Sequence, residues 1–360
     1  MAVYTLHGMV NVTMMPDSHG LEQQSYQGVA VQTIQIVVLT LTFFIVVFGN
    51  IVMLHCLLSI KEMKNTTGIL LISLVTTDLG VGIFCIPFAI ATTADHDLVH
   101  SRLFCNMTGF SLILFLDSSL LTMAVISVQK YMTIGYSLQP RFTRKHALYG
   151  ILAIWTISLL FASAPAVGWD SYAHSTHGHQ CAPSGRYLLG LTYQAASLTC
   201  CLVVPTITMM YCNGKILIFL RAHMSKMKAS GISRSRFSKR PGVSAAERRM
   251  VKTLMLMMLL FFISWSPCFI YMGMEIAQAN YPPYLEDIVL DFAFASSAVN
   301  PILYAMRHRE FRKGFKLSIL KLCRMTENTD NQHTGDEHCV RNAFTVNIRL
   351  QDMHSSETLI

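Results

Sequence analysis

The sequence predicts an all-α membrane protein, a bundle of seven transmembrane helices followed by a short amphipathic helix. Three observations support this fold class. The chain of 360 residues is 52% hydrophobic and only 13% charged, whereas soluble domains carry about 25% charged residues. Seven apolar stretches each have the length of about 20 residues that a membrane span needs. Basic residues are frequent in every second connecting loop and rare in the loops between. This alternation is expected of a multi-pass protein.

The seven apolar stretches define the domain organisation. Residues 1–32 precede them as a polar N-terminal tail, and 33–306 form the predicted transmembrane domain. Residues 307–322 mix apolar and basic side chains, which indicates an amphipathic helix on the membrane surface. Residues 323–360 are polar and predict a disordered tail. The predicted spans are residues 33–58, 68–93, 104–131, 146–168, 187–220, 250–275 and 285–306.

The distribution of Lys and Arg predicts the orientation in the membrane. Basic residues are frequent between spans one and two, three and four, and five and six, and again after span seven, while the opposite loops offer only Arg102 and Arg186. By the positive-inside rule the N-terminus is extracellular and the C-terminus cytoplasmic, as in a multi-pass protein of the plasma membrane. Because the basic residues border the spans, the net charge of +8 does not indicate a nucleic-acid partner.

The third span is predicted to connect both membrane faces with a buried polar position. At a rise of about 1.5 Å per residue, Cys105 lies at the outer face, Asp117 near the midplane and Lys130 at the inner face. Cys181 lies in the next outer loop. In an oxidising compartment these two cysteines can form a disulfide, the alternative being two free thiols.

Polar residues inside the spans are functional candidates, because polar groups are costly in lipid. Trp265 and Asn300 each stand close before a proline, Pro267 and Pro301. Proline removes a backbone donor and can bend a helix, so both places are candidate hinges. The polar residues within the spans are Asn50, Asp78, Asp117, Ser119, Ser296, Ser297 and Asn300.

Taken in order, these features resemble the rhodopsin-like (class A) G-protein-coupled receptors over roughly residues 33–325. The resemblance implies seven helices, an extracellular ligand pocket, a Cys105–Cys181 disulfide and an inner crevice for a heterotrimeric G protein. The motifs that carry it are Gly49-Asn50, Leu74 to Asp78, Cys105 with Cys181, Trp155, Pro205, Trp265-Ser266-Pro267, Asn300 to Tyr304 and Phe311-Arg312.

Within that family the chain looks most similar to the branch of amine, adenosine and melatonin receptors. Ile86 to Ile90 and Gly168-Trp169 resemble adenosine receptors. Their ligand is not implied, because their nucleoside-binding amide corresponds to Met272 and their span-seven histidine to Phe294. Phe294 also replaces the retinal-bearing lysine of opsins, and Leu112 replaces the acid that anchors amines.

The ligand pocket implied by the resemblance contains one acid within the membrane. Asp117 follows Leu112 by five residues, a rotation that leaves it about 140° away around the helix, so we expect it to face spans four and five. There it either contacts a polar group of a ligand or forms an internal hydrogen bond. Acidic residues at the outer ends of the spans either steer a cationic small molecule to the pocket or form a solvated rim. The implied pocket residues are Leu112, Leu116, Asp117, Phe269, Met272, Asp291 and Phe294.

The resemblance also implies an allosteric sodium ion, and no other cofactor or metal. All five positions of the family's sodium pocket carry suitable residues. A cation there would stabilise the resting state by binding it better than the active state. The alternative is an ion-free, hydrogen-bonded Asp78. The five residues are Asp78, Ser119, Trp265, Ser297 and Asn300.

The inner end of span three departs from the family. The usual acid-Arg-Tyr triplet is Gln129-Lys130-Tyr131, and Glu247 stands where the family has an acid at the base of span six. Lys130 can reach Glu247 only as a point charge, without the bidentate geometry of arginine. Gln129 cannot supply the first ion pair. We therefore expect a weaker restraint on the resting state and raised basal activity. Tyr304 completes the implied switch and G-protein interface.

Motifs outside the bundle predict modifications and further partners. Asn11 begins a glycosylation sequon, and Cys323 follows the amphipathic helix as a candidate palmitoylation site. The last four residues match a PDZ-domain ligand in which Thr358 and Ile360 determine specificity. Serines and threonines beside them are candidate phosphorylation sites for arrestin binding.

Three other interpretations are open to the sequence. A receptor impaired in signalling by Gln129 and Lys130 would act as a scaffold or decoy. A transporter would move solute without a G protein, although seven spans without an internal repeat do not favour one. An intramembrane protease would need paired aspartates in a glycine-containing motif or a His-Glu-x-x-His motif. Neither is present, so we predict that the chain is not an enzyme.

Overall fold

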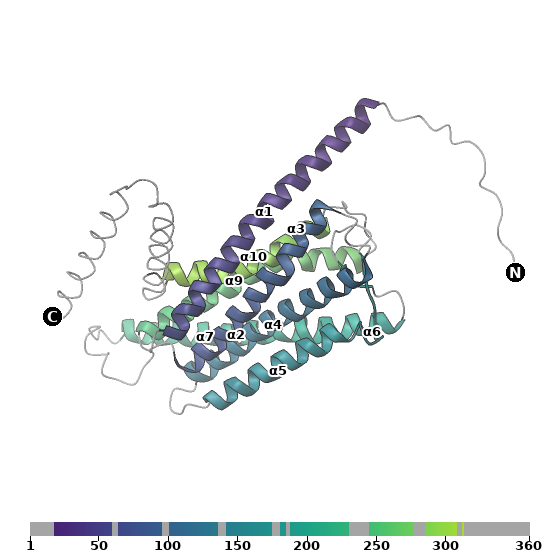
Figure 1. The fold of residues 1–360 in the computed structure, drawn as a ribbon. Coiled ribbons are helices and arrows are strands. Elements are labelled where there is room, and N and C mark those ends of the chain that lie inside the picture. Colours follow the sequence, from purple (N-terminus) through teal and green to yellow (C-terminus); the bar gives the residue numbers. More distant parts are fainter. Residues whose placement is uncertain are drawn as a thin grey trace, which may run out of the picture.

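The computed structural model describes residues 18–59, 64–95, 101–135, 142–174, 181–184, 188–229, 245–276, 279, 285–307 and 312. These residues form a helical bundle with one small hairpin (Figure 1). The elements are α1 (Ser18–Ser59), α2 (Thr66–Gly80), η2 (Val81–Cys85), α3 (Ile86–Ala94), α4 (Arg102–Gly135), α5 (Arg144–Ser163), β1 (Tyr172–His174), β2 (Cys181–Pro183), α6 (Leu188–Ser197), η4 (Leu198–Val203), α7 (Val204–Ala229), α9 (Ala245–Ile276) and α10 (Leu285–Arg307).

The helices combine into seven membrane-length units. The second unit is continuous through α2, η2 and α3, and the fifth through α6, η4 and α7. Within the described residues, 6 helices are long and apolar enough to cross a membrane, and Met255–Cys268 of α9 adds a shorter apolar stretch. Many large apolar side chains of α1, α5 and α7 remain exposed. In a bilayer those side chains would face lipid.

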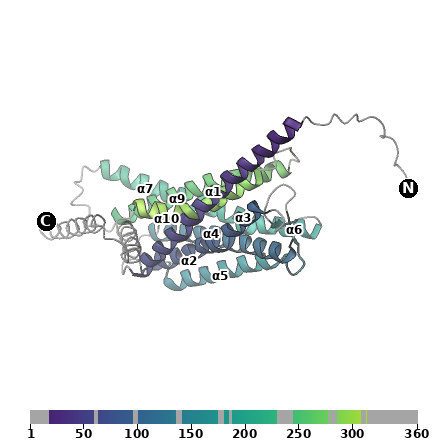
Figure 2. The same ribbon diagram turned by 45° about the horizontal axis from the view of Figure 1, so that its top comes forward.

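Helix α4 lies in the middle of the bundle in both views (Figures 1 and 2). It packs against α2, α5 and α7, and its first turns contact the β1–β2 hairpin. Helix α1 packs against α2 and α10, and α9 packs against α10. A single helix therefore contacts elements at both ends of the bundle.

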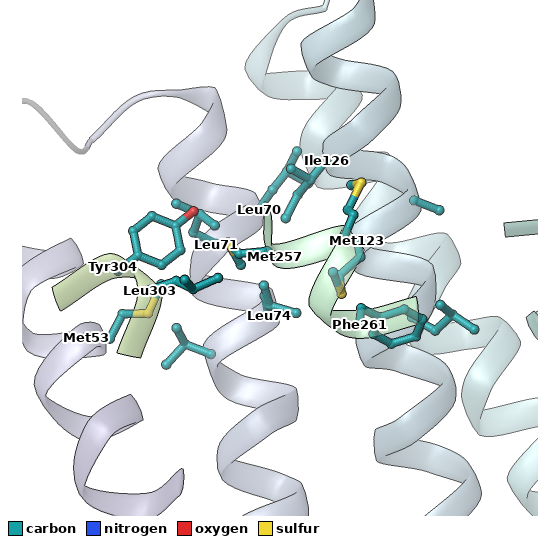
Figure 3. Packing of buried hydrophobic residues seen from close by; sticks show 14 of the residues in the cluster. Met53, Leu70, Leu71, Leu74, Met123, Ile126, Met257, Phe261, Leu303 and Tyr304 are labelled. Atoms are coloured by element: carbon teal, nitrogen blue, oxygen red, sulfur yellow. The ribbon is translucent and has the colours of Figure 1, made fainter. Parts of the chain in front are cut away.

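A large apolar cluster binds the helices together toward the end that contains Lys130. Figure 3 shows Met53 of α1, Leu74 of α2 and Met123 of α4 meeting residues of α9 and α10. Tyr304, at the end of the Asn300-Pro301 motif, is fully buried in this cluster. Any movement of α9 or α10 must therefore rearrange contacts with α1, α2 and α4.

One glycine permits a close approach between the first and last spans. A Cβ atom on Gly49 of α1 would lie 2.8 Å from the Cγ atom of Pro301 in α10. Because the proline ring is rigid, a larger residue at Gly49 would force the two backbones apart. The Gly49-Asn50 motif thus allows α1 to contact the proline of α10.

The prolines act in different ways. Pro87 lies in the first turn of α3, directly after the π-helical turn η2, and Pro205 likewise follows η4. A π-helical turn is wider than an α-helical one, and proline is tolerated at the start of the helix that follows. Pro267 and Pro301 lie inside α9 and α10. Pro165, expected within span four, instead follows α5, which ends at Ser163.

The first helix begins earlier than expected. Residues 18–32, assigned from sequence to a polar tail, form the beginning of α1, which projects beyond the other helices (Figure 1). Apolar patterning marks the membrane-embedded part of a helix, whereas polar residues can continue it into water. Several expected features lie outside the described residues, namely the sequon at Asn11, the helix over 307–322 apart from Arg307 and Arg312, Cys323 and the C-terminal motif with Thr358 and Ile360.

Candidate functional sites along α4

The first site along α4 is the disulfide at its N-terminal end. Cys105 is bonded to Cys181, and their Cα atoms are 5.3 Å apart. The disulfide joins α4 to β2, which pairs antiparallel with β1. Tyr172 of β1 packs with both cysteines, and its hydroxyl donates a 2.8 Å hydrogen bond to the Ala162 carbonyl of α5. The hairpin is therefore held over α4 and α5, and we call this end of the bundle the disulfide end.

The predicted pocket residues separate into two groups. Leu112 and Leu116 are buried with Phe294 of α10. Trp265, which is partly buried, packs against this cluster. Asp117 faces the other way, where the Cys201 thiol of η4 donates a hydrogen bond to its carboxylate. The rotation of about 140° between Leu112 and Asp117 explains this separation. The backbone at Phe269 and Met272 belongs to α9, but their side chains lie outside the described part.

A buried polar cluster lies at the middle of the bundle. Asp78 is fully buried and accepts a 2.7 Å hydrogen bond from the Asn300 side-chain amide and a 3.4 Å hydrogen bond from the Ser119 hydroxyl. Within the described part of the chain, Ser297 Oγ and Trp265 Nε1 are buried and have no hydrogen-bond partner. Three of the other residues expected in the sodium pocket, Ser119, Ser297 and Asn300, thus surround the Asp78 carboxylate.

The donor set of this cluster fits a small hard cation. Sodium, like other hard cations, prefers oxygen ligands, and Asp78, Ser119, Ser297 and the Asn300 amide supply carboxylate, hydroxyl and carbonyl oxygen. The Ser297 hydroxyl lies beside the Asp78 carboxylate, and within the described residues no donor occupies its oxygen. The Trp265 ring can only donate through its N–H, so it can bound the site without coordinating an ion.

The opposite end of α4 carries a polar cluster built around Lys130. The Lys130 ammonium donates a 2.7 Å hydrogen bond to the hydroxyl of Thr67 in α2. The Thr67 hydroxyl in turn donates a 3.3 Å hydrogen bond to the Gln129 side chain. Thr67, Gln129 and Lys130 are all buried, with 5%, 4% and 9% of their surfaces exposed. We call these three residues the α4–α2 clamp.

Local structure fixes both sides of this clamp. Asn65 caps α2 by accepting a hydrogen bond from the Gly68 amide, which sets the first turn containing Thr67. Arg144, at the start of α5, donates a 2.8 Å hydrogen bond to the Lys64 carbonyl. On α4, the Gln129 amide donates to the Thr133 hydroxyl at 3.1 Å. Glu247 belongs to α9, but its side chain lies outside the described part.

Sequence reasoning did not identify Thr67 or Cys201 as site residues. Threonine is common in the first turn of a helix, and a membrane cysteine is usually an apolar packing residue. Neither residue therefore carried a signal until the fold placed Thr67 beside Lys130 and Cys201 beside Asp117. Tyr211, two residues before the position where the family has a phenol, lies edge-on to the Tyr131 ring at 6.0 Å between centroids.

The fold and these sites define a seven-helix membrane receptor, and comparisons with known proteins identify its family. Residues 49–304 match the family described as 7 transmembrane receptor (rhodopsin family). Galanin receptor 2b of Danio rerio is 27% identical over 307 residues, which cover 83% of this chain and 78% of that protein. Trace amine-associated receptor 6 of Mus musculus is 26% identical over 279 residues, covering 75% and 81% of the two chains. The crystal structure of squid rhodopsin superposes with a TM-score of 0.72 at 20% identity, covering 87% of this chain and 90% of that one.

The chain belongs to the rhodopsin family of seven-transmembrane receptors. It is a class A G-protein-coupled receptor, a multi-pass plasma-membrane protein that signals to G proteins, and not an enzyme. The more specific prediction of the amine, adenosine and melatonin branch is not confirmed, because similar proteins include galanin receptors, trace amine-associated receptors and rhodopsins. Neither the transporter nor the decoy interpretation finds support in these comparisons.

Proposed function

We propose that the receptor transduces an extracellular small-molecule signal and is held in its resting state by the α4–α2 clamp, weakly enough to signal without ligand. The observation that carries this proposal is the contact between Lys130 and Thr67. In the family, an arginine on the third span forms ion pairs at this position. Here Lys130 contacts a neutral hydroxyl, and its neighbour Gln129 has no charge.

The strength of the clamp determines the expected basal activity. A buried hydrogen bond to a charged group contributes about 1.5–3 kcal/mol, and each ~1.4 kcal/mol changes a population ratio tenfold. A bidentate arginine–carboxylate pair adds a second, charge-assisted hydrogen bond. Replacing such a pair by the hydrogen bond between Lys130 and Thr67, in which lysine lacks the bidentate geometry of arginine, therefore raises the fraction of receptor that is active without ligand.

The first experiment compares basal G-protein activation in cells expressing the wild type and the double variant Gln129→Asp with Lys130→Arg. Surface expression is measured for both, and each G-protein class is tested with its own reporter. The proposal predicts a ligand-independent signal in the wild type that the double variant lowers. A silent wild type whose double variant gains signalling would instead support the impaired receptor that acts as a scaffold or decoy.

We propose further that sodium binds at Asp78 and stabilises the resting state. The support is the fit of the oxygen donors of Asp78, Ser119 and Ser297 to a hard cation. A ligand that binds one state better than another shifts the balance toward that state. Replacing sodium by N-methylglucamine would then raise basal signalling in the wild type, whereas the Asp78→Asn variant would not respond.

The orientation follows from the positive-inside rule, with the disulfide end extracellular and Lys130 cytoplasmic. A disulfide at the extracellular end agrees with the redox conditions there. Asp95, at the disulfide end of α3, is exposed and belongs to the acidic outer residues that favour a cationic ligand by electrostatic steering. Arrestin and a PDZ-domain protein are proposed partners of the cytoplasmic tail, on the basis of its serines, threonines and final motif.

A further inference from the structure

The buried acid of α4, Asp117, lies apart from the polar cluster around Asp78. Asp117 lies against η4, the π-helical turn of the fifth unit, through its contact with the Cys201 thiol. Tyr172 and Tyr193 lie close enough for the charge of Asp117 to act on their phenols. These residues come from α4, β1, α6 and η4, so the acid stands among elements next to the disulfide end.

We propose that Asp117, η4 and the rings of Tyr172 and Tyr193 form a subsite for the protonated amine of an extracellular ligand. This inference rests on the proposed ligand-driven function and adds the chemical group that the ligand carries. It places the amine on the η4 side of α4, away from Leu112 and Phe294, which belong to the apolar cluster on the other side.

The first argument is the missing hydrogen-bond donor. An ionised carboxylate can only accept hydrogen bonds. The Cys201 thiol supplies one weak donor, and the second oxygen, Asp117 Oδ2, is buried and has no hydrogen-bond partner among the described residues. Tyr172 donates its hydroxyl proton to the Ala162 carbonyl at 2.8 Å, and Tyr193 donates to the Phe161 carbonyl at 3.0 Å. Neither phenol is therefore available as a donor to the acid.

Leaving the buried Asp117 carboxylate without a second donor costs free energy. Ser118 and Ser158 also have buried hydroxyls without a partner in the described part of the chain. A neutral hydroxyl costs about 1–3 kcal/mol in this situation, whereas a charged group costs more. Asp117 as a whole residue is only half-buried, although its Oδ2 atom is buried. A bound cation would offset the cost at a place that is not fully closed.

The groups around Asp117 determine which kind of cation fits there. Aromatic rings attract an ammonium group, and Tyr172 and Tyr193 lie within the electrostatic reach of the acid. Because Asp117 Oδ2 needs a hydrogen-bond donor, an ammonium with at least one N–H satisfies it, whereas a quaternary ammonium does not. The subsite therefore favours primary to tertiary amines.

The test uses a charged reagent and needs no knowledge of the ligand. Ser197, one turn before Cys201 and partly exposed, is replaced by cysteine as a reporter. Membranes containing the full chain are treated with 2-aminoethyl methanethiosulfonate, which is cationic, or with methyl methanethiosulfonate, which is neutral. The reporter thiolate attacks the sulfenyl sulfur, a disulfide forms and methanesulfinate leaves. Peptide mass mapping gives the rate at which each reagent labels the reporter. Each rate is divided by the rate at which the same reagent reacts with 2-mercaptoethanol.

The proposal predicts that the reporter prefers the cationic reagent by about tenfold or more, since a charge in a partly buried site attracts strongly. Asp117→Asn should abolish this preference, and Asp117→Glu should retain it. Ser118→Ala is the matched control, because it removes a buried neutral hydroxyl from the neighbouring position of α4 and leaves the charge of Asp117 in place; it should change the preference less than about twofold.

Two results would overturn the proposal. One is a reporter that neither reagent labels, because the site would then be closed. The other is an absent preference in the chain with Asp117 intact, or a preference that survives Asp117→Asn, because the acid would then not attract the cation. If Asp117→Asn fails to accumulate, the labelling preference of the chain with Asp117 intact still tests the proposal. Labelling does not depend on G-protein coupling, so this failure is distinguishable from failure of the proposed function.

Discussion

Removing the Thr67 hydroxyl should activate the receptor without ligand. Thr67→Val keeps the shape of the side chain but removes the acceptor for Lys130, 2.7 Å away, and the donor to Gln129. Both partners are buried, so the lost bond to a charged group is worth about 1.5–3 kcal/mol. If the clamp exists only in the resting state, the ratio of active to resting receptor rises roughly 10- to 150-fold.

This change is large enough to measure in cells. A receptor that is about 1% active at rest would become roughly 10–60% active. The assay is ligand-independent G-protein activation, measured by energy transfer between labelled G-protein subunits and divided by the amount of receptor at the surface. Thr76→Val is the matched control, because Thr76 lies on the same helix, is exposed and donates its hydroxyl proton to the Ile72 carbonyl of that helix. Equal basal signals from Thr67→Val, Thr76→Val and the wild type would refute the argument.

Three further predictions concern the rest of the bundle. Gly49→Ala should lower the melting temperature of the purified receptor, because its Cβ atom would lie 2.8 Å from Pro301. Gly214→Ala should not, because a Cβ atom there would meet no described atom within 4 Å. Equal melting temperatures of the two variants would contradict this explanation of the packing. Cys181→Ser should reduce thermal stability and surface expression, since the disulfide closes a loop with a sequence separation of 76 residues. Such a crosslink contributes about 4 kcal/mol to stability in the chain-entropy estimate. Unchanged stability would show that the hairpin holds α4 without the disulfide. Asp78→Asn should remove the sodium dependence of basal signalling, and a sodium response that persists in this variant would place the ion elsewhere.

Much of the fold could be predicted from the sequence, because lipid imposes a strong constraint. A span must be apolar for about 20 residues, so the positions of the seven helical units followed directly from hydropathy. The two cysteines at the outer face, Cys105 at the start of span three and Cys181 in the next outer loop, likewise predicted the disulfide. Helix ends were less predictable. Residues 18–32 continue α1 although they are polar, and α5 ends at Ser163, before the expected boundary.

The candidate sites were predictable only in part. Residues that match family motifs, such as Asp78 and Asn300, were recognised and are hydrogen-bonded to each other at 2.7 Å. Thr67 and Cys201 were missed because their roles depend on three-dimensional neighbours. The π-helical turn η4 is also invisible to apolar periodicity, since one wide turn shifts the helix face without changing its composition.

The rotation argument for Asp117 shows what helical geometry alone can supply. Five residues separate Asp117 from Leu112, and the structure places Leu112 toward Phe294 of α10 and Asp117 toward η4. Periodicity thus predicted the direction of the acid but not its partner. The identity of that partner required the register of η4 against α4, which depends on packing between segments far apart in the chain.

The measurement that tests the central claim most directly is the coupling between Thr67 and Lys130. Thr67→Val, Lys130→Met and the double variant are purified, and ligand-independent nucleotide exchange on a G protein is measured for each beside the wild type. If the 2.7 Å contact restrains the resting state, each single variant raises exchange and the double variant adds little, so that the coupling free energy is about 1–3 kcal/mol. Effects that add to within about 0.5 kcal/mol would show that the two residues act independently, and the clamp would not be what holds the receptor at rest.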